Sequence, residues 1–184
     1  MSSIADKIDR EENEQLRSIP AQRLIEKLSL LKNRISSAKK RWFWELLQNA
    51  SDYNISVNIK LIVTDERVTF YHDGAPFPDS NKQDDEIHTD NIGKFGTGLV
   101  STHILSSIMD IEGVCIDEDN ESYKFSLSLD RSCFMNKQEL IKQITQAKES
   151  LKSSAQKQKI VDSGQFNTSF SYRLGKPLPE LPVL

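Results

Sequence analysis

The stretch Arg41-Trp-Phe-Trp-Glu45-Leu-Leu-Gln-Asn49-Ala-Ser-Asp52 has the spacing of an amphipathic helix. At about 3.6 residues per turn, Glu45, Asn49 and Asp52 fall within an arc of about 60° on one face. The helix is therefore expected to point two carboxylates and one amide into the same space. The opposite side is apolar and can pack on a sheet. It is formed by Phe43, Leu46, Leu47 and Ala50.

The polar face of this helix has two interpretations. It can be the solvated side of an ordinary surface helix. Trp42 favours the other interpretation, because it falls at the margin of the polar face, and a polar stripe beside a large aromatic is typical of a pocket lining. Oxygen-bearing side chains that converge in a pocket suit a hard cation such as Mg²⁺, and a carboxylate there can act as a general base.

Composition bounds the class of protein. The 184 residues suffice for one domain with a sizeable core and are too few for two ordinary ones. The formal net charge of −3 gives no reason to expect nucleic-acid or membrane binding. Cys115 and Cys133 have no metal-site spacing and no disulfide framework, and the charged N-terminus is unlike a signal peptide. We therefore expect a soluble, cytoplasmic protein.

The rest of the chain changes period several times. Helical spacing is expected after Ser18 to Pro20, after Gly98 and again from Asn136, where Glu139 completes a capping box. Alternation or β-branched runs predict strands over residues 57–63, 68–72, 108–116, 123–129 and 166–174. This order of elements predicts an α+β layer structure.

The organisation follows from these patterns. Residues 1–17 are expected to form a flexible arm, residues 18–174 the domain, and residues 175–184 a Pro-rich tail or linker. Residues 78–98 are expected to be a loop or lid, because the first part is almost purely polar and has little to bury.

A glycine-rich segment, Gly93-Lys94-Phe95-Gly96-Thr97-Gly98, ends this loop. Such a segment can aim several backbone N–H groups at an anion, and the helix expected after it favours phosphate further. A plain turn into a helix would look similar. The spacing is neither that of a P-loop nor the Gly-x-Gly-x-x-Gly of dinucleotide folds and protein kinases.

Taken together, the motifs resemble a known family. Glu45-x-x-x-Asn49-x-x-Asp52, a strand that ends in Gly74, and Ile92-Gly-x-Phe-Gly-x-Gly98 resemble the ATP-binding domain of the GHKL superfamily. The look is closest to the ninety-kilodalton heat-shock chaperones and the sacsin-like ATP-binding proteins. The resemblance covers roughly residues 36–105, and residues 166–172 more weakly. It implies a Bergerat-type two-layer α/β sandwich, with helices on one face of a mixed, mostly antiparallel sheet.

The resemblance also implies roles for single residues. Glu45 would be the general base for the attacking water, Asn49 would hold Mg²⁺ on the phosphates of ATP, and Asp52 would line the nucleotide pocket. Residues 78–98 would be the ATP lid, in which Gly93, Gly96 and Gly98, with Lys94 nearby, would wrap the phosphates. Thr168 would match the threonine of the family's last strand, although an ordinary β-branched strand residue is the alternative.

One position departs from the family. Its adenine-binding motif runs Asp-x-Gly-x-Gly, and alignment on Gly74 puts His72 where the base-contacting aspartate belongs. Strand parity agrees, since His72 shares a face with Val68 and Phe70. A neutral imidazole nitrogen could accept a hydrogen bond from the adenine amino group. A one-residue slip would bring in Asp73 instead, and a surface histidine in a turn is the third alternative.

The expected function is an ATPase or ATP-driven conformational switch, as the N-terminal module of a larger chaperone-like or defence-type machine. A histidine-kinase-type catalytic domain and a nucleotide-sensing module with negligible hydrolysis are the alternatives. The resemblance implies ATP and ADP as ligands. It also implies a downstream domain or protein partner that supplies a catalytic Lys or Arg, and a nucleotide-dependent dimer. The isolated chain is expected to be slow, because that positive charge is missing.

Overall fold

A computed structural model of the chain describes residues 21–33, 41–51, 56–78, 100–116, 119, 121–158 and 165–175. The expected N-terminal arm, most of the expected lid (residues 79–98) and the tail beyond Gly175 lie outside these ranges. Asp52 and the whole glycine-rich segment Gly93 to Gly98 do so too.

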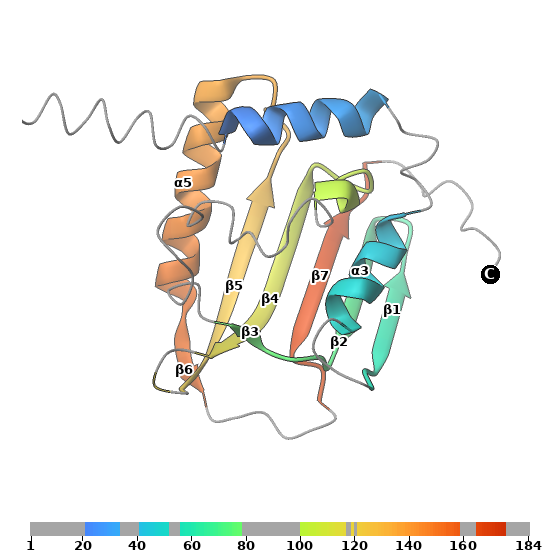
Figure 1. Cartoon of the computed structure of the whole chain (residues 1–184), viewed down its shortest axis with the longest axis vertical. Coiled ribbons are helices and arrows are strands. Elements are labelled where there is room, and N and C mark those ends of the chain that lie inside the picture. The colour runs from blue at the N-terminus through green and yellow to red at the C-terminus, as the bar shows by residue number, and fades with distance from the viewer. Residues whose placement is uncertain are drawn as a thin grey trace, which may run out of the picture.

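The described residues fold into a mixed sheet with helices packed against it, so the α+β class predicted from the sequence is confirmed (Figure 1). The sheet has seven strands within this part of the chain, and six of them follow the order β1-β2-β7-β4-β5-β6 with antiparallel neighbours. The short strand β3 pairs with β4 in parallel. The strands are β1 (Ile59–Val63), β2 (Arg67–His72), β3 (Phe77–Pro78), β4 (Ile108–Ile116), β5 (Ser122–Asp130), β6 (Gln156–Gln158) and β7 (Thr168–Arg173).

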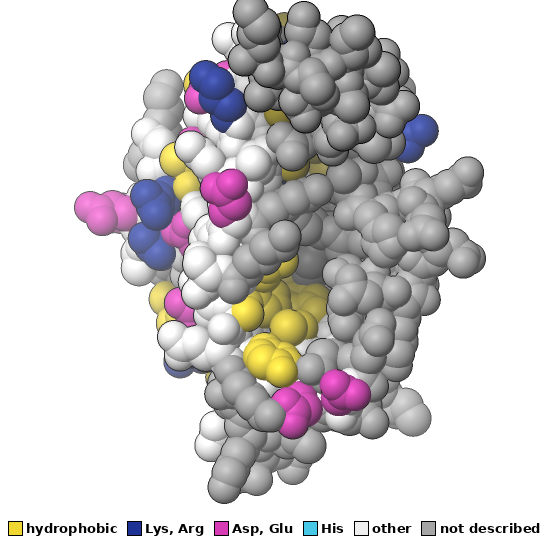
Figure 2. Space-filling view, turned by 90° about the vertical axis from the view of Figure 1, so that its left-hand side faces the viewer, with side chains coloured by type: hydrophobic (Ala, Val, Ile, Leu, Met, Phe, Trp, Pro, Cys, Tyr) yellow, Lys and Arg dark blue, Asp and Glu magenta, His cyan; other side chains and the backbone are white. Residues whose placement is uncertain are grey.

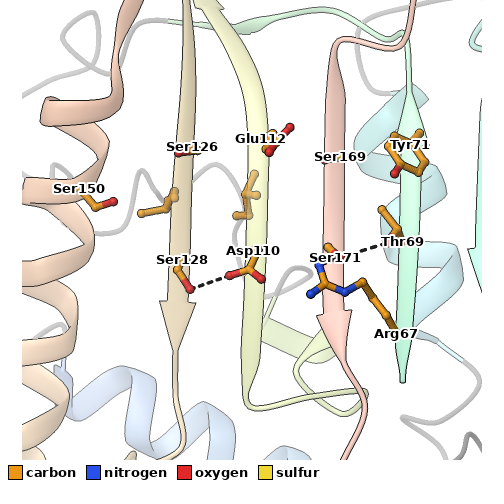
Figure 3. Close-up of a pocket in the computed structure, with 12 residues that line it drawn as sticks. Arg67, Thr69, Tyr71, Asp110, Glu112, Ser126, Ser128, Ser150, Ser169 and Ser171 are labelled. Atoms are coloured by element: carbon orange, nitrogen blue, oxygen red, sulfur yellow. Dashed lines mark hydrogen bonds between the residues drawn. The ribbon is translucent and has the colours of Figure 1, made fainter. Parts of the chain in front are cut away.

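The two faces of the sheet differ in polarity because side chains alternate along each strand. One face is apolar and carries the core, together with α3 (Trp42–Ser51) and α5 (Lys137–Ser154). The other face carries polar side chains around a hollow of about 470 Å³, on the side of the sheet away from α3 (Figure 3). The core face is built from Val68, Phe70, Met109, Ile111, Leu127, Leu129, Phe170 and Tyr172.

Helix α5 begins as the sequence predicts. The side chain of Asn136 accepts a hydrogen bond from the backbone N–H of Glu139 at 3.2 Å, which caps the first turn. Leu140 and Ala147 are buried, so the predicted apolar stripe faces the core. At the other end, Ser154 Oγ accepts from the backbone N–H of Ser126 and donates to its carbonyl oxygen, which ties the helix to β5. A helix over residues 21–33 lies across the same end of the molecule as the start of α5 (Figure 1).

Two expectations needed correction, and two short strands were missed. Strand β1 is mostly exposed rather than half-buried, because it is the last strand at one end of the sheet order; Ile59, Ile62 and Val63 keep 37–40% of their surface exposed. The helix expected after Gly98 is helical only over residues 100–102 of its described part, and a turn follows. Strands β3 and β6, of two and three residues, are too short to carry a periodic signal and were not predicted.

No helix in the described ranges is both long and apolar enough to cross a bilayer.

Candidate functional site

Helix α3 presents its polar side chains along the border of its buried stripe. Trp42, Leu46 and Ala50 form that stripe, one turn apart, and are at most 4% exposed. Trp42 therefore belongs to the core, and its expected place as the wall of a polar pocket is wrong. Glu45 and Asn49 are half-buried beside the stripe, which places them next to the sheet rather than opposite to it.

Glu45, the expected general base, is held in an ion pair on its own helix. Arg41 Nη2 donates to Glu45 Oε1 at 2.9 Å, across one turn. The side chain of Glu45 is only 14% exposed, whereas that of Arg41 is 69% exposed. A carboxylate at the edge of the core thus has one oxygen occupied by a cation that reaches in from solvent.

Asn49, the expected Mg²⁺ ligand, is the clearest sign of an incomplete site. Its Nδ2 atom is buried and has no hydrogen-bond partner within the described residues. A buried amide without partners costs stability, so such groups are rare in folded proteins. A half-turn about the last side-chain bond exchanges the amide nitrogen and oxygen. Asn49 can therefore present either a donor or a ligand oxygen to a bound group.

The end of β2 meets the last turn of α3 at Gly74. A β-carbon on Gly74 would stand 2.6 Å from the carbonyl oxygen of Ala50 and 2.9 Å from Nδ1 of His72. Only glycine allows the two backbones to approach this closely. This contact brings Asn49, on α3, and His72, on β2, to the same end of the sheet–helix interface.

His72 lies on the core face of the sheet, as parity predicted. It is 4% exposed, and its ring stacks on Phe170 with 6.0 Å between ring centroids. Burial lowers the pKa of His72 from 6.5 to about 4, and the negative charge of Asp73 opposes this only in part. The imidazole is therefore neutral at neutral pH. Its Nδ1 accepts a hydrogen bond from the backbone N–H of Gly74 at 3.1 Å.

Asp73 points to the other side of the strand end. Its two carboxylate oxygens accept from the backbone N–H and the side-chain amide of Asn58, both at 2.7 Å. These hydrogen bonds, chiefly the one from the side chain of Asn58, lower the pKa of Asp73. The geometry thus favours the alignment that puts His72, not Asp73, toward the interface with α3.

Thr168 is the direct cross-strand neighbour of His72 on β7 and is 2% exposed. Its hydroxyl donates to Oδ1 of Asn167 at 2.8 Å, and Nδ2 of Asn167 donates to the carbonyl oxygen of Gly74 at 2.8 Å. Asn167 was not singled out from the sequence. An asparagine at the start of a strand carries no signal of its own, because its role depends on a partner 93 positions away.

A second glycine makes room for aromatic rings farther along the core face. A β-carbon on Gly113 would collide with the rings of Phe77 and Phe125, which themselves pack with 5.4 Å between centroids. Neither ring was singled out from the sequence. Figure 2 shows hydrophobic side chains gathered in a recess on the side of the molecule that lies to the left in Figure 1, with acidic side chains at its lower rim.

The site could hold Mg²⁺ only if phosphate and water oxygens supply most of the ligands. Among the described residues, no three His, Cys, Asp or Glu side chains are grouped to hold a metal ion. Mg²⁺ is commonly bound through one or two protein oxygens plus phosphate oxygens and water. Asn49 and Glu45 can supply those protein oxygens.

A scan against protein-family models finds no family that matches the chain, and a search of curated proteins finds no significant match. The GHKL relationship therefore stays a prediction from the sequence motifs.

Proposed function

We propose that the chain is a Mg²⁺-dependent nucleotide-binding domain of the GHKL type, with a Bergerat-like two-layer sandwich, that acts as a slow nucleoside triphosphatase or a nucleotide-driven switch. ATP is the nucleotide that the resemblance implies. The observation that carries the proposal is the contact of Gly74 with Ala50. It gathers Asn49, His72 and Thr168 from three separate elements at one interface.

The roles follow from the chemistry of each group. Asn49 would bind Mg²⁺ through its side-chain oxygen or donate from Nδ2 to the nucleotide. The second contact would satisfy the buried Nδ2, which has no hydrogen-bond partner among the described residues. Glu45, one turn earlier on the same border of α3, would orient or deprotonate the attacking water. His72 and Thr168 would contact the base. The segment Gly93 to Gly98, outside the described residues, would contact the phosphates through its backbone N–H groups.

A nucleotide-sensing module with negligible hydrolysis is the second candidate. The ion pair between Arg41 and Glu45 favours it, because a carboxylate oxygen that accepts from a guanidinium is not free to take a proton from water. The two candidates share the binding site and differ in whether Glu45 acts on water there.

Calorimetric titration of Mg²⁺ and nucleotide into the full chain tests the proposal. We expect a dissociation constant in the micromolar-to-millimolar range, about −8 to −4 kcal/mol, which is lost in Asn49→Ala. Gln48→Ala, one position earlier on the exposed side of α3, is the matched control and should bind as wild type does. Asn49→Ala should lower the free energy of unfolding little, because Nδ2, the buried donor that it removes, has no hydrogen-bond partner among the described residues. Equal affinity in wild type and Asn49→Ala would remove the ligand role of Asn49.

A further inference from the structure

The peptide of Gly74 fixes the direction of two chains of hydrogen bonds. Its N–H can only donate, so Nδ1 of His72 must accept. Its carbonyl can only accept, so the amide nitrogen of Asn167 must face it and Oδ1 must face Thr168. Since Oδ1 can only accept, the hydroxyl of Thr168 must donate. The polarity of both base-contacting candidates is thus set by backbone groups that cannot reverse.

The first chain decides what His72 can offer. A neutral imidazole carries one proton, and a nitrogen that accepts cannot hold it. With Nδ1 accepting, the proton sits on Nε2. Protonation of both nitrogens is disfavoured by burial, which lowers the pKa of His72 to about 4. The remaining hydrogen-bonding group of His72 is therefore a donor, so the acceptor role expected from the sequence is not available.

The second chain decides what Thr168 can offer. Its single hydroxyl proton is committed to Asn167, which leaves only the oxygen lone pairs. Thr168 is the cross-strand partner of His72, and both are buried on the core face. Side chains paired in this way have β-carbons about 5 Å apart. The two strands thus place a donor on β2 beside an acceptor on β7.

We propose that this donor–acceptor pair selects a 6-oxopurine nucleotide, of the guanine or hypoxanthine class, over an adenine nucleotide. The inference rests on the proposed nucleotide site and concerns only the choice of base. A 6-oxopurine presents an acceptor, O6, next to a donor, N1–H. Nε2–H of His72 would donate to O6, and Oγ1 of Thr168 would accept from N1–H. Adenine presents the reverse order, an amino donor next to the acceptor N1.

Binding of adenine in the same position would set donor against donor and acceptor against acceptor. Buried polar groups left unmatched in this way cost far more than a missing contact. The experiment compares Mg²⁺ complexes of ATP and inosine triphosphate by calorimetry on the full chain. Inosine triphosphate carries O6 and N1–H without the 2-amino group of guanine, so the two ligands differ only at the edge in question. We expect it to bind at least about tenfold more tightly than ATP.

Three variants test whether His72 and Thr168 cause the preference for inosine triphosphate over ATP. His72→Asp replaces the donor by an acceptor and should reverse the preference in favour of ATP. Thr168→Val keeps the shape of the side chain but removes the acceptor, and should reduce the advantage of inosine triphosphate. Thr69→Val is the matched control, because Thr69 lies on β2 but on the polar face of the sheet, and it should keep the wild-type ratio.

A measurement on the wild-type chain covers the case in which a variant fails to fold. Long-range ¹H–¹⁵N correlation spectra of the His72 ring distinguish the two neutral tautomers. We expect the proton on Nε2 at pH 7, both in the free protein and with inosine triphosphate bound. A proton on Nδ1 would overturn the inference.

The outcomes separate this inference from the function on which it rests. If ATP binds as tightly as inosine triphosphate or more tightly, the base inference fails and the proposed nucleotide site stands. If no purine triphosphate binds to the folded wild-type chain, the proposed function fails and this inference falls with it.

Discussion

Gly74 and Ala50 are in backbone contact, with space for a β-carbon at position 74 already occupied by the carbonyl oxygen of Ala50. The end of β2 and the last turn of α3 therefore meet without a side chain between them. Asn49 and His72 lie beside this approach, since Asn49 precedes Ala50 by one residue and His72 precedes Gly74 by two.

Gly74→Ala should separate the two elements. The added β-carbon would stand 2.6 Å from a backbone oxygen that cannot move without α3. We expect a loss of about 1–3 kcal/mol in the free energy of unfolding, together with loss of nucleotide binding. Urea denaturation measures the first effect. Gly175→Ala is the control, because a β-carbon there meets open space, and its effect should stay within about 0.5 kcal/mol.

The stability of the fold should depend on pH between about 6.5 and 4. Burial lowers the pKa of His72 from 6.5 to about 4, so the unfolded chain binds a proton in this window and the folded chain does not. Stability is then fully present above pH 6.5 and falls as the pH falls toward 4, by about 3 kcal/mol at most for His72.

The variant His72→Asn tests whether His72 causes this pH dependence, and His103 is expected to contribute to it as well. Denaturant unfolding at pH 7 and pH 4.5 should show a smaller difference in His72→Asn, which keeps an acceptor for the N–H of Gly74. His103, whose pKa is also lowered to about 4 by burial and by Arg131, adds to the slope in the same direction. The pKa of Asp73 is lowered, so it acts only below the window. An unchanged slope in His72→Asn would show that His72 is protonated as easily in the folded chain as in the unfolded one.

Substitution of Glu45 should lower turnover, whereas substitution of Arg41 should not. Glu45→Ala is expected to keep nucleotide affinity and to lower phosphate release by about 10²–10⁴-fold. Arg41→Ala frees the carboxylate that the guanidinium occupies, so turnover should stay the same or rise. A phosphate-release assay measures both. Equal turnover in Glu45→Ala and wild type, at a wild-type rate clearly above background, would exclude Glu45 as the base.

Asp73 should matter for structure and not for base choice. Both of its oxygens accept from Asn58, so Asp73→Ala removes a link between the start of β1 and the end of β2. We expect a modest loss of stability and an unchanged ratio of affinities for ATP and inosine triphosphate, measured by calorimetry. A change of that ratio in Asp73→Ala, with none in a His72 variant, would show that the slipped alignment is correct.

The sequence predicted what local spacing determines. The helix around Glu45 and Asn49, the inward parity of His72 and the cap at Asn136 all follow from periods of a few residues, and the structure has each of them. Trp42 was misplaced because the direction in which a helix faces the core is decided by the sheet it packs on. Alternation over β1 could not distinguish an edge strand from an inner one, since both alternate in the same way.

Which groups of His72 and Thr168 donate and which accept could not be predicted from the neighbouring sequence. Whether His72 donates or accepts depends on the backbone N–H of Gly74. Whether the hydroxyl of Thr168 donates or accepts depends on Asn167, whose amide donates to the carbonyl oxygen of Gly74. These partners are joined by the pairing of β2 with β7, across nearly a hundred residues of chain. No pattern in either segment alone carries that information.

The position of β7 in the sheet has a consequence for how the protein is made. It is the last described strand in the sequence, yet it lies between β2 and β4 and is what joins them. Two antiparallel pairs are synthesised before β7, namely β1 with β2 and β4 with β5. Each pair has an unpaired edge until residues 168–173 are available. Pairings of this sequence separation are slow to form and expose edges that aggregate. A chain that ended before Thr168 would therefore lack the strand that joins β2 to β4, and no residue of β7 would stand opposite His72.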